Sequence, residues 1–230
     1  MRLLLLTMIL AAGIAGAGYA QGGFVQSAGA SIGYNVFDKD GKTFVNPAPD
    51  VTGSPFYKDD WRLGQLILND NRKYDSVRVR LNLSSQEVHI LDRNNTEIAL
   101  ARGYIKEVLW PHYSETRFQN GFPPVDNQEA TGFYAVLSEG KRWLLQSIRK
   151  VITERKDDPS GEVSREYTTY EDDYIYDGKT MLRVKMDKAF LLAALSDKKD
   201  LVASFIGSHK LKIKSADEVK QVVDYYNMLP

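Results

Sequence analysis

Residues 77–83 read VRVRLNL, and this stretch decides the fold. Its four apolar residues alternate with two arginines and an asparagine. Because successive side chains of a strand point to opposite faces, this alternation predicts a half-buried antiparallel strand. Turn-forming residues follow at Ser84-Ser85 and again at residues 92–95, roughly ten residues apart, which is the spacing expected for a sandwich or barrel.

The same pattern predicts further strands before and after residues 77–83 in the sequence. An Asp177-Gly178 pair joins two of them, because Asp-Gly is a strong signal for a two-residue turn. Alternation also assigns His89, which lies between two apolar residues, to the solvent-facing side of its strand. Segments 111–130 and 153–165 are polar and rich in turn residues, so we expect a long loop and then a turn or linker. The predicted strands are residues 61–68, 77–83, 88–90, 98–100, 104–110, 133–138, 142–149, 174–176 and 180–184.

The C-terminal end is predicted to be helical. One helix is expected over residues 188–195, capped by Asp187, and a second over 198–206, with Gly207 as its stop. A capping box beginning at Ser215 precedes four apolar residues spaced i, i+3, i+4 and i+7, which predicts a third helix with one apolar stripe. Such a stripe has to bury against the neighbouring sheet. The predicted fold class is therefore α+β: an antiparallel β-rich meander (open sheet, sandwich or partial barrel) with about three C-terminal helices.

Residues 1–20 have the pattern of a secretory signal peptide. One positive charge precedes an uncharged leucine-rich run, and small residues precede a cut ahead of Gln21. This predicts an exported chain, periplasmic or extracellular, with no membrane span after cleavage because no later stretch is long and apolar enough. Glycines and prolines make residues 21–54 loop-like or partly disordered. The β-rich region 55–185 and the helices of 186–230 are expected to form one domain.

The composition excludes several kinds of site. The chain has 230 residues, with 30 Lys and Arg against 30 Asp and Glu, and it has no Cys. Without Cys there is no disulfide, no thiolate metal centre, no cysteine nucleophile and no lipoprotein anchor. A formal net charge of zero argues against nucleic acid as the partner, because nucleic-acid binders carry basic surfaces.

No motif predicts catalysis, a metal site or a cofactor. The three histidines are far apart in the sequence, and no H-x-x-x-H or H-x-H pair signals zinc. His112 lies beside Tyr113, Ser114 and Glu115, but no G-x-S-x-G elbow accompanies it. We therefore predict no catalytic residue, no metal ligand and no cofactor. A hydrolase centred on residues 111–130 is the least favoured alternative.

Two groups of residues are interpreted as an interaction surface. Aromatic and imidazole side chains in the 111–130 loop offer contact area for a partner. Three lysines alternate with Leu211 and Ile213, which places them on one side of an extended segment. There they protect a sheet edge, the preferred interpretation, or meet an anionic surface. The residues of this predicted surface are His112, Tyr113, Phe118, Lys210, Lys212 and Lys214.

Four stretches of the sequence carry a resemblance to a group of proteins. They are GSPFYKDDWRLGQLILND, KYDSVRVRLNL, GFYAVLSEGKRWLLQSIRK and the long segment from YIYDGKTMLRVKMDKAF to VKQVVDYYN. Together they resemble small exported proteins of Bacteroidota that have no assigned function. In that group a strand meander precedes a short apolar helix, a D-K-K-x-x-[LV] helix and a final helix ending in YYN. The likeness covers most of residues 53–229 and implies the fold and the export address, but it carries over no catalytic residue.

Three functions follow from these observations, in order of preference. The first is a non-enzymatic protein of the cell envelope that works through contact with another envelope protein or with itself. The second is a small-ligand or glycan-binding module, which predicts a concave pocket lined by Tyr or Trp. The third is the hydrolase centred on His112.

Overall fold

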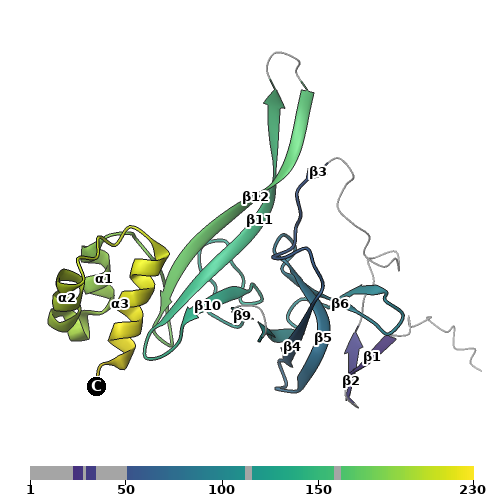
Figure 1. Ribbon diagram of the computed structural model, residues 1–230, viewed down its shortest axis with the longest axis horizontal. Helices are drawn as coiled ribbons and strands as arrows, with labels where there is room; N and C mark the ends of the chain where they lie inside the picture. Colours follow the sequence, from purple (N-terminus) through teal and green to yellow (C-terminus); the bar gives the residue numbers. More distant parts are fainter. Residues whose placement is uncertain (1–22, 28–29, 35–50, 112–115, 158–161) are drawn as a thin grey trace, which may run out of the picture.

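The computed structural model describes residues 23–27, 30–34, 51–111, 116–157 and 162–230. Within them the protein is an open, largely antiparallel sheet of 11 strands with helices at its C-terminal end, as Figure 1 shows, which confirms the α+β prediction. The predicted signal peptide at residues 1–20 lies outside the described residues.

The described strands form two sheets. They are β1 (Gly23–Ser27), β2 (Ala30–Tyr34), β3 (Val51–Thr52), β4 (Arg62–Leu68), β5 (Lys73–Asn82), β6 (Glu87–Leu91), β7 (Glu97–Ala99), β8 (Ile105–Trp110), β9 (Thr116–Gln119), β10 (Tyr134–Ser138), β11 (Trp143–Asp157), β12 (Glu162–Tyr176) and β13 (Met181–Arg183). β1 and β2 pair with each other. The other strands follow the order β13-β12-β11-β10-β9-β8-β4-β5-β6-β7, and β3 adds in parallel to β12.

The strand that decides the fold lies in the middle of the main core. The apolar side chains of β5 point inward with those of β4, β6 and β8, which confirms the alternation. A close approach of backbones requires the glycine at position 64 of β4. A Cβ on Gly64 would lie 2.7 Å from Cγ1 of Val79 and 3.0 Å from the carbonyl oxygen of Leu109.

Three segments expected to be irregular contain strands. The predicted loop-like segment 21–54 contains β1, β2 and β3. β9 lies inside the predicted loop 111–130 and pairs with both β8 and β10. The predicted turn or linker at 153–165 is the far end of two long strands, because β11 continues to Asp157 and β12 begins at Glu162. Apart from Val163, both strands are polar on both faces there, so the sequence lacks the apolar alternation that reveals a half-buried strand.

The three C-terminal helices are confirmed. They are α1 (Lys188–Ala194), α2 (Lys199–Ser208) and α3 (Ala216–Met228), with a short 3-10 turn, η1 (Ser196–Lys198), before α2. Asp187 and Ser215 cap α1 and α3 by accepting backbone N–H bonds, as predicted. Gly207 does not stop α2, which includes it and ends one residue later. No helix among the described residues is long and apolar enough to cross a membrane.

The YYN sequence at the end of α3 ties the helices to the sheet. Tyr225 stacks on a phenylalanine of α2, and the buried Tyr226 donates a hydrogen bond to Asp197 at 2.7 Å. The side chain of Asn227 accepts the backbone N–H of Arg142 at 3.0 Å and donates to the Arg142 carbonyl oxygen at 2.8 Å. Asn227 therefore fastens α3 to the turn between β10 and β11.

The segment before α3 is not the extended strand that its alternating lysines suggest. Lys210 and Ile213 both have left-handed backbones, with φ of 54°. The carboxylate of Glu218 accepts the backbone N–H groups of Lys212 and Lys214 at 3.0 and 2.7 Å, which folds the segment back over the start of α3. The prediction that these lysines protect a sheet edge is therefore wrong, although their side chains are exposed.

Candidate functional site

The predicted contact residues do not come together in the described structure. His112 and Tyr113 lie outside the described residues, so a role for His112 stays a prediction. Phe118 is fully buried, with its ring edge-on to Tyr57 at 4.8 Å and to Trp110 at 6.1 Å between centroids. A ring in the core is not accessible to a partner, and Phe118 does not belong to a contact surface.

The feature that sequence reasoning missed is a projecting hairpin. β11 and β12 have 15 residues each and pair in register over their whole length. Their outer half, residues 151–157 and 162–168, projects from the main sheet in Figure 1 with only β3, of the described strands, beside it, and we call it the arm. Its exposed apolar side chains are Val151, Ile152 and Val163, which are 43%, 43% and 46% exposed.

One edge of the arm is open. The backbone N–H of Lys150 donates to the Leu83 carbonyl oxygen at 3.3 Å, so it points away from β12. Because backbone groups alternate in direction along a regular strand, the N–H and carbonyl groups of Ile152, Glu154 and Lys156 also point away from β12. No described residue pairs with the edge of β11 that faces away from β12 beyond Lys150, so these groups form an unpaired edge.

The opposite edge of the arm is partly covered. β3 pairs with β12 at Arg165 and Glu166, and the N–H of Val184 donates to the Asp173 carbonyl oxygen at 2.8 Å. The second bond shows that odd-numbered residues of β12 point outward, in agreement with the assignment for β11. The β11 edge is therefore the more accessible of the two.

Side chains hold the two strands of the arm together. The guanidinium of Arg165 lies 2.9 Å from the Glu154 carboxylate, and the hydroxyls of Thr153 and Thr168 are 2.6 Å apart. These pairs fix the ribbon without covering its edge, because both join β11 to β12. The arm is thus a preformed extended ribbon.

Charged groups fix the base of the arm. Arg149 lies 2.9 Å from Asp172, which also contacts Arg183. The Lys150 ammonium donates to the Phe56 carbonyl oxygen at 2.6 Å, and burial lowers the pKa of Lys150. The direction in which the arm projects is therefore set by contacts on several elements.

Tyrosines below the arm have perturbed pKa values for structural reasons. Burial raises the pKa of Tyr134 to about 12. Burial, together with a 2.7 Å hydrogen bond donated to Asp126, raises the pKa of Tyr174 even more. Both phenols are protonated at neutral pH, so neither can accept a proton there. No three His, Asp or Glu side chains among the described residues are placed to hold a metal ion.

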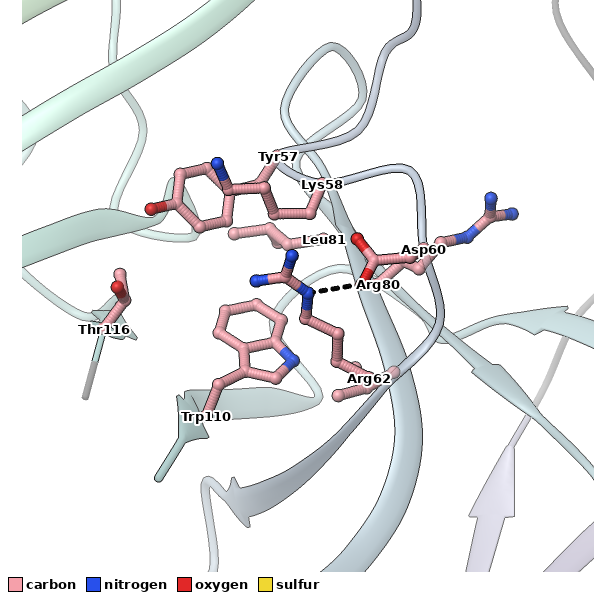
Figure 2. A pocket seen from close by; sticks show the side chains of 9 residues that line it. Tyr57, Lys58, Asp60, Arg62, Arg80, Leu81, Trp110 and Thr116 are labelled. Carbon is pink, nitrogen blue, oxygen red and sulfur yellow. Dashed lines mark hydrogen bonds and ion pairs between the residues drawn. The ribbon is translucent and has the colours of Figure 1, made fainter. Parts of the chain in front are cut away.

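One enclosed pocket on the sheet is too small for an organic ligand. Figure 2 shows Arg62 reaching between Trp110 and Tyr57, where it pairs with Asp60 at 2.7 Å. The remaining space is about 20 Å³, which holds a single water. A larger polar hollow of about 200 Å³ lies at the base of the arm, beside Arg149. It is smaller than the roughly 300–1,000 Å³ of ordinary ligand pockets. A wider hollow of about 440 Å³ lies over β8, β9 and β10 beside Arg117 and Val136, but it is open to solvent and does not enclose a ligand.

His89 lies where alternation places it, on the outer face of β6, but that face is covered. The prediction of a solvent-facing His89 is wrong, because the segment before β4 folds over it and leaves it 2% exposed. Phe56 packs edge-on against the imidazole, and Nδ1 lies 2.7 Å from the Glu97 carboxylate. Glu97 also accepts from Arg80 at 2.8 Å, and the Arg80 guanidinium is sandwiched between Phe56 and Trp61.

This cluster predicts a pH-dependent contribution to stability. Burial disfavours the charged form of Glu97, but the hydrogen bonds from His89 and Arg80 outweigh it and lower the pKa of Glu97 below 4.5. A lowered pKa stabilises the folded state above pH 4.5 and stops doing so as the pH falls through the folded-state value. We expect Glu97→Gln to lower the unfolding free energy at pH 7. At acid pH the difference in unfolding free energy between this variant and the native protein should become smaller. Urea titrations between pH 7 and 3 measure this, and a gap independent of pH would contradict it.

The arm, and not an enclosed pocket, is thus the most distinctive described surface. Comparisons with protein-family models, with curated proteins and with solved structures find no match for this chain.

Proposed function

We propose that this chain is a non-catalytic protein of the cell envelope that binds another protein chain through the β11–β12 arm. The observation that carries the proposal is the open edge of β11 on a projecting ribbon. A two-stranded ribbon in water is only marginally stable by itself, so one with apolar side chains on its surface gains from a further strand. The envelope location rests on the pattern of residues 1–20.

The mode of binding that fits this edge is strand addition. An extended segment of a partner would pair with the outward groups of Ile152, Glu154 and Lys156, and main-chain hydrogen bonds would supply affinity. Alternate side chains of the partner would lie beside the exposed Val151 on one face and Ile152 on the other. An open edge that serves no partner is a hazard, because it also templates aggregation.

A proline substitution tests this mode directly. The N–H of Glu154 points away from β12, so Glu154→Pro removes an edge donor without removing a backbone hydrogen bond between β11 and β12. It also removes the ion pair between Glu154 and Arg165, so Glu154→Ala, which loses that pair but keeps the N–H, should still capture the partner. The matched control is Thr169→Pro, which places the same ring on the outward side of β12. We expect crosslinking in the source cell to capture a partner with the tagged native chain and with Thr169→Pro, but not with Glu154→Pro.

Folding has to be checked alongside capture. Circular dichroism and thermal melts of the purified variants should show that Glu154→Pro keeps the native sheet. Capture of the same partner by a folded Glu154→Pro variant would overturn the proposal, and so would a native chain that captures no partner.

A further inference from the structure

The open edge of β11 is a short run of unpaired backbone groups, which we call the window, and it has a central residue. Leu83 occupies the position beside Lys150, and the strand ends soon after Lys156. Between these limits Ile152, Glu154 and Lys156 present their backbone groups, and Glu154 is the middle one. The window is therefore symmetric about a single residue.

Symmetry restricts how a second copy can fill this window. A dimer of identical surfaces has a two-fold axis, and directly opposed residues of antiparallel strands point to the same face. The axis must then lie midway between two copies of the same residue, one from each chain. An axis at Glu154 uses the whole window and stays clear of Leu83. It places Ile152 opposite the second copy's Lys156, and Thr153 opposite the second copy's Arg155.

The side chains that this axis brings together are complementary. The two Glu154 carboxylates face each other, but each is already paired with Arg165 of its own arm at 2.9 Å. The second copy's Lys156 is the diagonal neighbour of Glu154, within reach of a long side chain. On the face of Glu154, each arm contributes Lys156 and Arg165 against one carboxylate, so cations outnumber carboxylates there. The exposed Ile152 lies along the aliphatic stem of the opposite Lys156, with the exposed Val163 beyond it.

We propose that the chain which adds to the arm is a second copy of this protein, paired antiparallel through β11 about Glu154. This inference rests on the proposed function, since it names the partner of the same edge. The pairing covers a few residues, well below the roughly 1,200 Å² of a stable interface. Association is therefore weak and depends on concentration.

The absence of Cys from the chain makes this geometry directly measurable. Single cysteines are placed at Ile152, Thr153, Glu154, Arg155 and Lys156 of the full chain, and each variant is mildly oxidised. In the proposed pair the two Cα atoms of residue 154 are about 5.5 Å apart, inside the range of about 4.4–6.8 Å for a disulfide. The two copies of residue 153 are separated by about 7–8 Å. We expect Glu154→Cys to form a disulfide dimer several times faster than any neighbouring variant.

A second measurement uses the chain without cysteine. Sedimentation of the native protein should show self-association that rises with concentration, that survives Thr169→Pro and that Glu154→Pro abolishes. A flat cysteine profile, a maximum at another residue, or association unchanged by Glu154→Pro would overturn the self-pairing. If the cysteine profile is flat while Glu154→Pro still prevents capture of a different protein, self-pairing is wrong and the proposed function stands. If the cysteine profile is flat and Glu154→Pro still captures the same partner as the native chain, both the self-pairing and the proposed function are wrong.

Discussion

Replacing Gly64 by alanine should destabilise the protein by about 2–3 kcal/mol, the upper part of the range for an overpacked core. β4 lies between β5 and β8, so the backbone at this position is enclosed on both sides. An added Cβ would meet Cγ1 of Val79 at 2.7 Å and the Leu109 carbonyl oxygen at 3.0 Å. The carbonyl belongs to the backbone of a paired strand and cannot rotate away. Urea unfolding monitored by tryptophan fluorescence measures the change.

Gly207→Ala is the matched control for this prediction. Gly207 lies inside α2 with an ordinary helical backbone, and an added Cβ would meet nothing within 4 Å. The same substitution should stabilise the chain there by about 0.4–1 kcal/mol, because alanine restricts the unfolded chain and favours helix. Equal effects at the two glycines would contradict the account of the sheet centre.

Replacing Asn227 by alanine should cost about 2 kcal/mol and loosen the helices from the sheet. The substitution leaves the N–H of Arg142 without its acceptor and removes the donor to the Arg142 carbonyl oxygen and to the Ser138 hydroxyl. These three groups lie at the turn between β10 and β11 or at the end of β10, close to Gly140, where a Cβ would lie 2.5 Å from the Asn227 side chain. The close fit gives water little room to replace the lost amide.

Hydrogen exchange distinguishes a lost anchor from a general loss of stability. In Asn227→Ala we expect faster exchange in α3 and in the 139–142 turn, with the β4–β8 core unchanged. Gln221→Ala, on the exposed side of the same helix, should change neither exchange nor stability beyond about 0.5 kcal/mol. Uniformly faster exchange across the sheet in Asn227→Ala would show that the anchoring interpretation is wrong.

The sequence predicts an element well where a single face is buried. β5 alternates cleanly because one side meets the core, and α3 shows its stripe because its own Val219, Val222 and Val223 all face one apolar cluster. In both, local periodicity carries the same information as the tertiary structure. The caps at Asp187 and Ser215 are predicted for a similar reason, since the bond that defines each cap spans three residues.

Prediction fails where a distant segment decides the environment. Alternation assigns His89 to the correct face of β6, but only the folded path of residues 55–61 buries that face. The arm is missed for the opposite reason: it buries neither face, so residues such as Thr153 and Glu166 show no apolar period. The lysines before α3 do alternate, but the Glu218 carboxylate holds their backbone in a fold that no period reveals.

The candidate site follows the same rule. An open strand edge is defined by the strand that is missing beside it, and no residue of β11 encodes that absence. Lys150 shows the edge only because its N–H reaches Leu83, a residue far away in the chain. Composition does supply one useful constraint, since a chain without Cys reports any introduced thiol without background.

The pairing of β3 with β12 has a consequence for the order in which the molecule assembles. β11 ends at Asp157 and β12 begins at Glu162, close together in the sequence, so their hairpin can close on the scale of about 1–10 μs. Val51 pairs with Arg165, and most of the described chain lies between these two residues. Closing so long a loop costs conformational entropy before the contacts between β3 and β12 can form. A chain that emerges N-terminus first therefore exposes β3 long before its partner strand exists. Once both of its strands have emerged the ribbon closes quickly, and β3 pairs with it more slowly, so we expect a stage in which both edges of the arm are open.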